Sequence, residues 1–501
     1  MASTDGVPNA LDLFSTLPTQ IAIEEGFDDI IYPKTGIEDG NPIEFNIKPS
    51  YNCAIDPKEL YLCFTCSLVD EQGRKIPKQY PHMIGGDSST SGTTPPTTSS
   101  RGEQRSGPLN PSSFVIPVNG LLSSMIEDVT VKMHGTVISG GENTYAHKAD
   151  LENRLSYPKE SKEGSLTLIN YNEEKIPFED LTRDQIEEIF KEGEKIKNNK
   201  NSLLYPFFDR AEHVFEGDNF TMRGKLHTEI VDQNKFLPAG KGIEIKIELK
   251  KGKFYLMTVH GERINPRLKI HKAYMQVRNA QLSPEILLEQ TKDLERFGNY
   301  IIPIRRTVLK SFSIGGPTTK DISVNELSTG YLPRRVIVGL LKNSAYNGDY
   351  GLDPFNYQHF NIESVELKVD GRSKPYTGAI EVCFDKQRSE DYTMGYFTLL
   401  RASYSLFNVK DIGLRLKDYM QRNVLFGFDL TPSLTAAGQS FEKLKPGVVS
   451  LHIRLSEGAT EALTVVAYCE YDSQISIDRY NNVSLLHLSP YTADVKVIGN
   501  A

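Results

Sequence analysis

Two cysteines stand at a spacing that metal sites use. Cys63 and Cys66 form a CxxC motif inside the run LYLCFTC. The aromatic and apolar residues of this run favour a β-strand, and on a strand, side chains three residues apart point to opposite faces. A structural zinc site also needs two more ligands, and neither a second CxxC nor a close histidine pair follows. We therefore interpret both thiols as small buried side chains.

The remaining chemistry-bearing residues form no catalytic pattern. The ten histidines are scattered without an HExxH motif, and the chain contains no GxSxG, GxxxxGKS/T or helix-opening GxGxxG sequence. No sequence motif therefore supports a hydrolase, a P-loop protein or a dinucleotide-binding protein. The carboxylate pairs Glu173–Glu174 and Glu187–Glu188 lie among many charges, which predicts solvated faces. We expect no catalytic residue, no cofactor-binding residue and no metal ligand, and hence neither an enzyme nor a cofactor.

The charge balance opposes direct binding of nucleic acid. The chain of 501 residues carries a formal net charge of −8, and Lys250, Lys251 and Lys253 form only a short basic cluster. A surface that neutralises phosphates needs an excess of Lys and Arg. Hydrophobic residues make up 39% of the chain and charged residues 24%, which is the balance of a folded globular protein.

We also expect no targeting signal. The chain contains no apolar run of about 18 residues, so we expect no membrane span. Its start, MASTDGVPNALDLFST, lacks the basic and then apolar run of a signal peptide. We expect a protein of the cytosol or nucleus, where its five cysteines stay reduced. Burial in strands should raise the thiol pKa of Cys63, Cys66 and Cys469.

The elements that carry these residues are mostly strands, because the dominant hydrophobic period is two. In GIEIKIELK, apolar side chains alternate with charged ones, as a half-buried strand requires. NVLFGFDL and LTVVAYCEY are apolar enough to be buried on both faces. The same alternation recurs at Ile43, Phe45 and Ile47; at Val129, Val131 and Met133; at Val365, Leu367 and Val369; and at Leu451, Ile453 and Leu455. Many short strands between turn residues predict an all-β protein of antiparallel sandwiches.

One helix near the middle of the chain divides it. Ser283 and Pro284 are suitable for its N-cap and first turn, and Gly298 is suitable for its end. We expect residues 283–299 to connect a first sandwich, residues 41–282, to a second, residues 300–487, with a C-terminal tail at 488–501. Tight turns are predicted at Asn347–Gly348 and Asp370–Gly371.

Two segments of the first sandwich resemble insertions. Residues 85–113 contain almost no apolar side chains, which predicts a mobile loop. Residues 176–201 are charged, with Thr182 and Gln185 at capping-box spacing. Ile186, Ile189, Phe190 and Ile196 follow at the spacing of one apolar helix stripe. We expect a surface helix there.

Residues 1–40 are predicted to be an arm that acts in assembly. They show no sustained strand or helix period, and they combine the apolar run Leu11–Phe14 and Leu17 with acidic residues such as Glu24 and Asp28. No Lys or Arg precedes Lys34, so the arm cannot tether a genome by charge. We expect its apolar segment to be buried under a neighbouring subunit.

Several blocks of the chain resemble one viral family in order. They are LDLFSTLPTQ and NPIEFNI near the start, NTYAHKADLENRLSYPKESKEGSL, RGKLHTEIVDQNKFLPAGKGIEIKIELKKGKFYLM, IPIRRTVLKSFSIGG, the long run from LPRRVIVGLL to VELKVDGR, NVLFGFDLTPSL and VVAYCEYDSQISIDRYNNV. These blocks resemble the major capsid proteins of Polinton (Maverick) elements and the related adintoviruses.

The resemblance implies two tandem eight-stranded jelly rolls, the double jelly-roll capsid fold. It further implies homotrimers of hexagonal outline that contact one another in an icosahedral shell around double-stranded DNA. The expected partners are other copies of the chain and a penton or minor capsid protein. The expected location is the virion, after synthesis in the host cytoplasm and with assembly there or in the nucleus.

Three other interpretations remain open at the level of sequence. A carbohydrate-binding or attachment jelly roll shares the sandwich, although the chain has no Trp for a sugar-binding groove. A cupin-like metalloenzyme would need clustered histidines. An endogenous copy of an element, retained by its host genome, would keep the fold and change the biology. The sequence names neither the virus nor the host.

Overall fold

The fold was analysed in a computed structural model. It describes residues 20–37, 40–76, 114–215, 219–258, 265–315, 319–385, 391–403, 406, 411–436, 438 and 440–485. The segment 85–113 and the tail 488–501, for which we predicted a mobile loop and a C-terminal extension, lie outside these residues, as does the apolar run at 11–17.

The first half of the chain forms two four-stranded antiparallel sheets. One has the order β1-β10-β3-β7 and the other β2-β8-β5-β6, while β4 and β9 form a separate ribbon. The strands are β1 Ile23–Ile31, β2 Ile43–Ile47, β3 Cys53–Val69, β4 Val115–Pro117, β5 Ile126–Met133, β6 Thr136–Ser139, β7 Phe220–Lys225, β8 Ile243–Leu249, β9 Leu256–Thr258 and β10 Arg267–Leu282.

The second half forms two five-stranded sheets. One has the order β11-β19-β13-β17 with β20 beside β19, and the other β12-β18-β14-β15 with β16 beside β14. The strands are β11 Asn299–Ile314, β12 Asp321–Tyr331, β13 Arg335–Lys342, β14 Ile362–Val369, β15 Arg372–Ser373, β16 Ile380–Glu381, β17 Leu425–Asp429, β18 Pro446–Leu455, β19 Leu463–Asp478 and β20 Val483–Leu485.

The two halves repeat one topology. When the ribbon strands β4 and β9 and the short strands β16 and β20 are set aside, each half has eight strands in chain order. In both halves the first strand pairs with the eighth, the eighth with the third and the third with the sixth. The second pairs with the seventh, the seventh with the fourth and the fourth with the fifth. Between described residues, no strand of one half pairs with a strand of the other.

The alternating runs of the sequence are confirmed as strands with one buried face. β2, β5, β8, β14 and β18 bury the apolar positions that the period of two selected, except that Leu249, at the end of β8, is half-buried. Burying one large aliphatic or aromatic side chain contributes about 1.5–3 kcal/mol, so these faces hold each sandwich together. β17 and the first part of β19 are buried on both faces, as expected.

Helix α10, Thr393–Ala402, explains the two-sided burial of β17. It lies so close that a Cβ atom on Gly427 would stand 2.8 Å from the carbonyl oxygen of Thr398 and 2.5 Å from the Cβ of Ala402. Glycine is therefore required here by the approach of another backbone.

The remaining helices are short. They are α1 Leu121–Ser124, α2 Tyr145–Ser156, α3 Lys159–Glu163, α4 Arg183–Lys191, α5 Gly193–Asn198, α6 Tyr205–Phe215, α7 Gly252–Tyr255, α8 Pro284–Phe297, α9 Asn343–Asn347 and α11 Leu416–Arg422, with 3-10 turns at Ser165–Ile169 and Phe178–Asp180. No helix among the described residues is both long and apolar enough to cross a bilayer.

The predicted helix boundaries agree with the structure. α8 has Ser283 as N-cap and Pro284 in its first turn, and it ends before Gly298. The side chain of Ser283 nevertheless makes no capping hydrogen bond. Thr182 and Gln185 form a complete capping box at α4, and the predicted apolar stripe at 186, 189, 190 and 196 is buried.

One local prediction was wrong. Residues 23–31, for which we expected no strand, form β1 and pair along β10 from Ile23 to Ile31. The period was hidden because β1 is an edge strand that buries neither face. Asn347–Gly348 forms a tight turn as predicted, at the end of helix α9, where Gly348 has positive φ and its N–H donates to the carbonyl oxygen of Ala345. Asp370–Gly371 is confirmed, since both residues have positive φ and connect β14 to β15.

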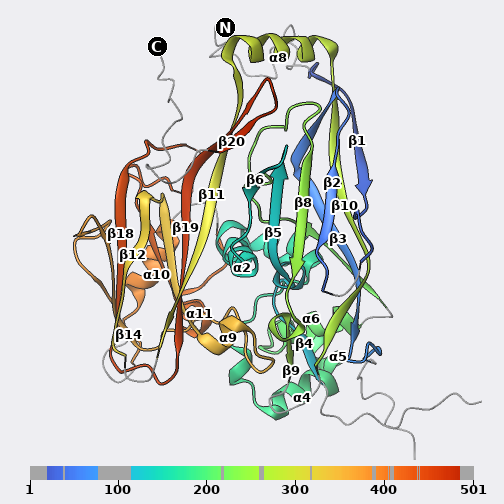
Figure 1. Ribbon diagram of the computed structural model, residues 1–501. Coiled ribbons are helices and arrows are strands. Elements are labelled where there is room, and N and C mark those ends of the chain that lie inside the picture. Colours follow the sequence, from blue (N-terminus) through green and yellow to red (C-terminus); the bar gives the residue numbers. More distant parts are fainter. Residues whose placement is uncertain are drawn as a thin grey trace, which may run out of the picture.

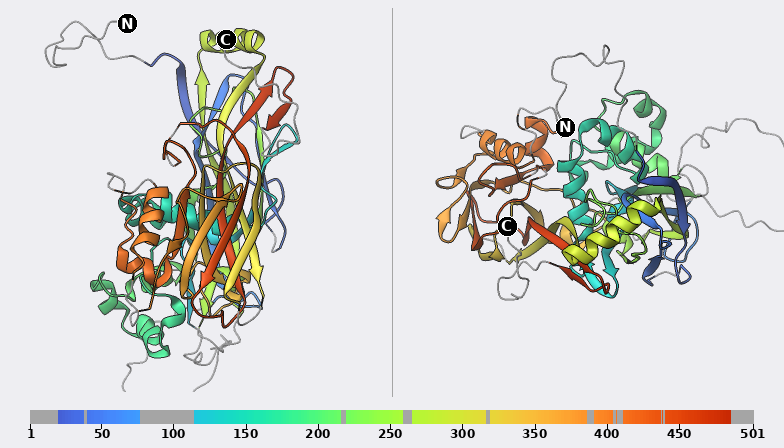
Figure 2. Two further views of the ribbon diagram at one scale, coloured as in Figure 1. Left: turned by 90° about the vertical axis from the view of Figure 1, so that its left-hand side faces the viewer. Right: turned by 90° about the horizontal axis from the view of Figure 1, so that it is seen from above.

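The two sandwiches lie side by side with their long axes roughly parallel (Figure 1). Helix α8 crosses one end of the molecule, α4, α5 and α9 lie toward the other, and α2 lies between the sandwiches. The view from above in Figure 2 shows the two lobes and α8 over the first of them.

Candidate functional site

Helix α2 fills the contact between the sandwiches. Alanines and leucines give Tyr145–Ser156 a high helix propensity, and the helix ends before Pro158. Its residues 145–155 are all buried, although many of them are charged. A helix that is polar on all sides is ordinarily exposed. The charges of α2 must therefore find partners in both sandwiches, and we call this buried contact the seam.

The first group of seam partners is a four-membered ionic cluster. Glu174 lies 2.8 Å from Arg210 and 2.6 Å from Arg422, and Arg422 lies 2.6 Å from Asp353. All four side chains are fully buried. Glu174 and Arg210 belong to the first half of the chain, while Asp353 and Arg422 belong to the second. Two positive and two negative charges thus balance across the seam.

The second group surrounds Arg154 on α2. Its Nε donates to both carboxylate oxygens of Asp150, one turn earlier, at 2.8 and 2.9 Å. Its Nη1 donates to the side chain of Asn423, and its Nη2 donates to the carbonyl oxygen of Phe355 at 3.2 Å. Lys162 donates to the carbonyl oxygens of Arg154 and Ile412 at 2.7 and 2.8 Å. Each cation therefore joins the first half to the second.

The third group lies where α2 faces the central strands of the second sandwich. Glu152 contacts Nδ1 of His227 at 2.8 Å and accepts from the hydroxyl of Tyr468, on β19, at 3.3 Å. Lys148 pairs with Glu229 at 2.8 Å, and Glu229 accepts from the backbone N–H of Thr307.

A neighbouring cluster fixes β13 to β19 within the second sandwich. Arg335 pairs with Glu470 at 2.6 Å, and Arg334 pairs with Asp472 at 2.7 Å. The Arg335 guanidinium also lies over the ring of Tyr468, 5.6 Å from its centroid. Tyr468 thereby connects this cluster to α2.

The electrostatics of the seam follow from burial and from partners. Burial alone would raise the pKa of Glu174, but Arg210 and Arg422 outweigh it and hold the pKa below its usual value. For Glu179, burial and the charge of Asp353 outweigh the hydrogen bond from Asn356 and the charge of Arg422, so its pKa is raised to about 7. Burial lowers the pKa of His147 to about 3, and this neutral ring stacks on Tyr346 at 4.6 Å.

These contacts hold side chains in place through ion pairs and hydrogen bonds. Among the described residues, no group of three or more His, Cys, Asp or Glu side chains could hold a metal ion. Cys66 lies in the core, whereas Cys63 accepts from Nε of Arg223 on the other face of β3. Burial raises the pKa of Cys66 and Cys469 to about 12, as predicted. The seam is therefore suited to holding the sandwiches at a fixed angle.

Sequence reasoning missed the seam. We predicted solvated faces for Glu173–Glu174, but the structure buries Glu174 completely between arginines of both halves. On α2, Lys148 and Glu152, and Asp150 and Arg154, stand four residues apart, a spacing that is also common on exposed helices. One signal could have helped: few residues around these charges are suited to an exposed face, since Tyr145, Ala149, Leu151 and Leu155 surround them.

Comparison with known proteins identifies the fold. No protein-family model matches the chain. An uncharacterized protein of Caenorhabditis elegans is 22% identical over 470 residues, which cover 93% of this chain and 98% of that protein. A chain of the Sputnik virophage superposes with a TM-score of 0.60 at 9% identity, covering 100% of this chain and 97% of that one.

Two further solved structures have a similar fold. VP54 of PBCV-1, fitted into a reconstruction of Sputnik, gives a TM-score of 0.53 at 9% identity and covers 95% of this chain and 99% of VP54. The Faustovirus major capsid protein gives 0.51 at 10% identity and covers 95% of this chain and 92% of that one. The fold is the double jelly roll. The tandem repeat of one strand order and the alignment over the whole chain both carry this assignment.

Proposed function

We propose that this double jelly roll is the major capsid protein of a double-stranded DNA virus or a Polinton-like element. The observation that carries the proposal is the repeat of one eight-strand topology in a single chain, joined by a buried ionic seam. The likeness to the Faustovirus major capsid protein along nearly the whole chain supports it. A shell subunit needs no catalytic centre, and the proposed role is structural.

The proposed assembly follows from the angle at which the seam holds the two sandwiches. Two similar lobes held at a fixed angle form a third of a hexagonal ring, so three chains can place six lobes around a three-fold axis. We therefore infer homotrimeric capsomers that contact one another in an icosahedral shell, with a penton or minor capsid protein as a further partner. We take the two units as residues 23–282, with β1 included, and 299–485, with α8 between them. The net charge of −8 favours protein partners over nucleic acid.

The test is the oligomeric state and outline of the purified chain. Light scattering at micromolar concentration should give three times the monomer mass, and negative-stain images should show hexagonal outlines. A particle that remains monomeric throughout this range would contradict the proposal.

A second candidate keeps the fold and changes the biology. The relative in a nematode spans 98% of its own length in the alignment, which favours a capsid gene copy carried in an animal genome. If such a copy still acts in an element, particles isolated from the source tissue should contain nuclease-protected DNA. Assemblies without protected DNA would favour a copy retained for the host.

A further inference from the structure

Helix α8 presents an unusual surface for the end of a folded subunit. None of its residues is buried, and Leu288 and Phe297 are 57% and 64% exposed. Ile301 and Phe236, beside the helix, are 50% and 42% exposed. Phe236, Phe297 and Ile301 line one surface, and exposed apolar side chains that gather in this way mark a site that binds another apolar segment.

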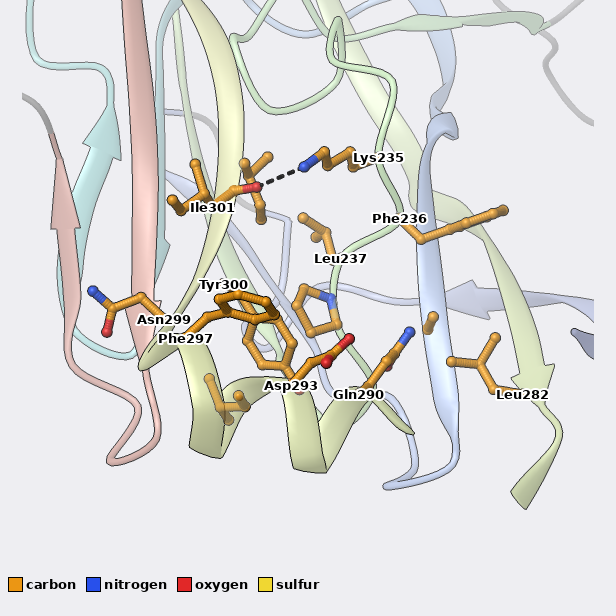
Figure 3. A pocket seen from close by; sticks show the side chains of 14 residues that line it. Lys235, Phe236, Leu237, Leu282, Gln290, Asp293, Phe297, Asn299, Tyr300 and Ile301 are labelled. Atoms are coloured by element: carbon orange, nitrogen blue, oxygen red, sulfur yellow. Dashed lines mark hydrogen bonds between the residues drawn. The ribbon is translucent and has the colours of Figure 1, made fainter. Parts of the chain in front are cut away.

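A groove lies directly beneath this helix. It encloses about 310 Å³ between α8, residues 235–238 and the start of β11. Figure 3 shows Phe236, Leu237, Phe297 and Tyr300 around the space, with Lys235 donating to the carbonyl oxygen of Ile301 at 3.0 Å. The volume suits one or two bulky apolar side chains, and the lining carries one positive charge, from Lys235, and one negative charge, from Asp293.

The chain enters the described structure at this end. The carbonyl oxygen of Ala22 accepts a hydrogen bond from the backbone N–H of Ser283, the N-cap of α8. The chain before Gln20 therefore begins near the N-terminal end of α8. The C-terminal half of α8 borders the groove. In sequence, they include Leu11–Leu17, LDLFSTL, in which Asp12 is the one charged residue.

Chain length allows this segment to reach the groove. Leu294, which lines it, lies about 16 Å along the helix from Ser283 at 1.5 Å per residue. The stretch from Phe14 to Gln20 spans up to about 20 Å when extended. Tethering raises the local concentration of the segment to the millimolar range, so even a weak apolar contact would be occupied.

We propose that residues 11–17 bind in the α8 groove of their own subunit, and not under the neighbouring subunit that we expected from the sequence. Phe14 enters the cavity, Leu17 covers the exposed side of α8 nearest the chain's entry, and Asp12 pairs with Lys235. The subunit thereby covers an apolar surface that would otherwise associate with other molecules. This inference goes beyond the proposed function, since it concerns one subunit and not a shell.

A peptide-binding experiment on the full chain tests the inference. The double variant Phe14→Asp/Leu17→Asp should release the segment, and a fluorescent peptide of residues 9–20 should then bind with a dissociation constant of about ten to one hundred micromolar. The wild-type chain should bind the peptide at least ten-fold more weakly, because its own segment fills the groove. Equal binding to both chains, or no binding to the variant, would overturn the proposal.

Two further substitutions in the released variant locate the site. Leu294→Asp should abolish peptide binding, because it charges the groove, whereas Glu295→Gln, on α8 but outside the groove lining, should leave binding unchanged. Circular dichroism verifies that both fold. Unchanged binding in Leu294→Asp would place the peptide elsewhere and refute the groove as its site.

Disulfide trapping distinguishes binding within one subunit from binding between subunits. Phe14→Cys with Phe297→Cys, at an exposed position, should give an intrachain disulfide on mild oxidation, with either single variant as control. Disulfide-linked dimers in place of the intrachain product would overturn binding within one subunit. Both experiments are done on dilute subunits, so a failure to form shells does not affect them.

Discussion

Helices α2 and α8 are both rich in charge, yet the structure treats them in opposite ways. α2 is buried at residues 145–155, whereas α8 has no buried residue. The difference lies in partners: the charges of α2 meet counter-charges and carbonyl groups from both sandwiches, while those of α8 are exposed, including Asp293 at the groove. Burial of a charge is tolerated only where a partner compensates the lost hydration. The two sandwiches therefore stabilise each other through α2. They do not bury α8.

Removing a charge is expected to have its largest effect in the seam. Arg422→Met leaves Glu174 and Asp353 without one of their cations, and it should lower the free energy of unfolding by about 3–5 kcal/mol. The matched control is Arg296→Met on exposed α8, which should change it by less than about 0.5 kcal/mol. Urea denaturation measures both. If the two variants lost equal stability, the seam would contribute no more to the free energy of unfolding than exposed α8 does.

Acid and base should act on the seam with opposite signs. The pKa of Glu179 rises from 4.5 to about 7 on folding, so its contribution is complete below pH 4.5 and is lost as the pH rises through 7. The pKa of Glu174 is lowered, so its contribution is present above pH 4.5 and is lost below it.

Glu179→Gln should therefore flatten the fall in stability between pH 4.5 and 7, an effect on the order of 1–3 kcal/mol. The amide can still face Asn356, which donates to Glu179 at 3.1 Å. Urea denaturation across this pH range measures the slope. A slope that persists in the variant would assign the titration to another group. Glu285→Gln, on α8, is the control and should keep the wild-type slope.

Helix N-termini give a smaller contrast. Thr182 completes a capping box at α4, so Thr182→Ala should cost about 1 kcal/mol. Ser283 makes no side-chain capping bond at α8, so Ser283→Ala should cost only a few tenths of that. Thermal unfolding of both variants compares them. A larger loss at Ser283 would mean that its hydroxyl caps α8 in solution.

The smallest effect is expected on the outer side of α8. Leu288 is 57% exposed, so Leu288→Lys should leave the melting temperature within a degree or two of wild type. Leu151→Lys, on buried α2, is the counterpart and should prevent stable folding, because it puts an unpaired charge in the seam. Melting of both by calorimetry checks the pair, and a strong loss at Leu288 would show that this side of α8 packs.

The sequence by itself determined the features that depend on neighbours along the chain. Alternation predicted β2, β5, β8, β14 and β18, because a half-buried strand imposes a period of two on its own residues. Local capping chemistry likewise located α4 and α8. The resemblance of ordered blocks supplied the tandem jelly rolls, which the strand order confirms.

Only the tertiary structure decided which charges are buried. The spacing of Asp150 and Arg154 is the same on an exposed helix and in the seam, and Arg422 lies far from Glu174 in the chain. β1 was missed because its identity as a strand comes from hydrogen bonds to β10 and not from a buried face of its own. A pattern of residues records the burial of a local face. It does not record a partner that folding brings from the other half of the chain.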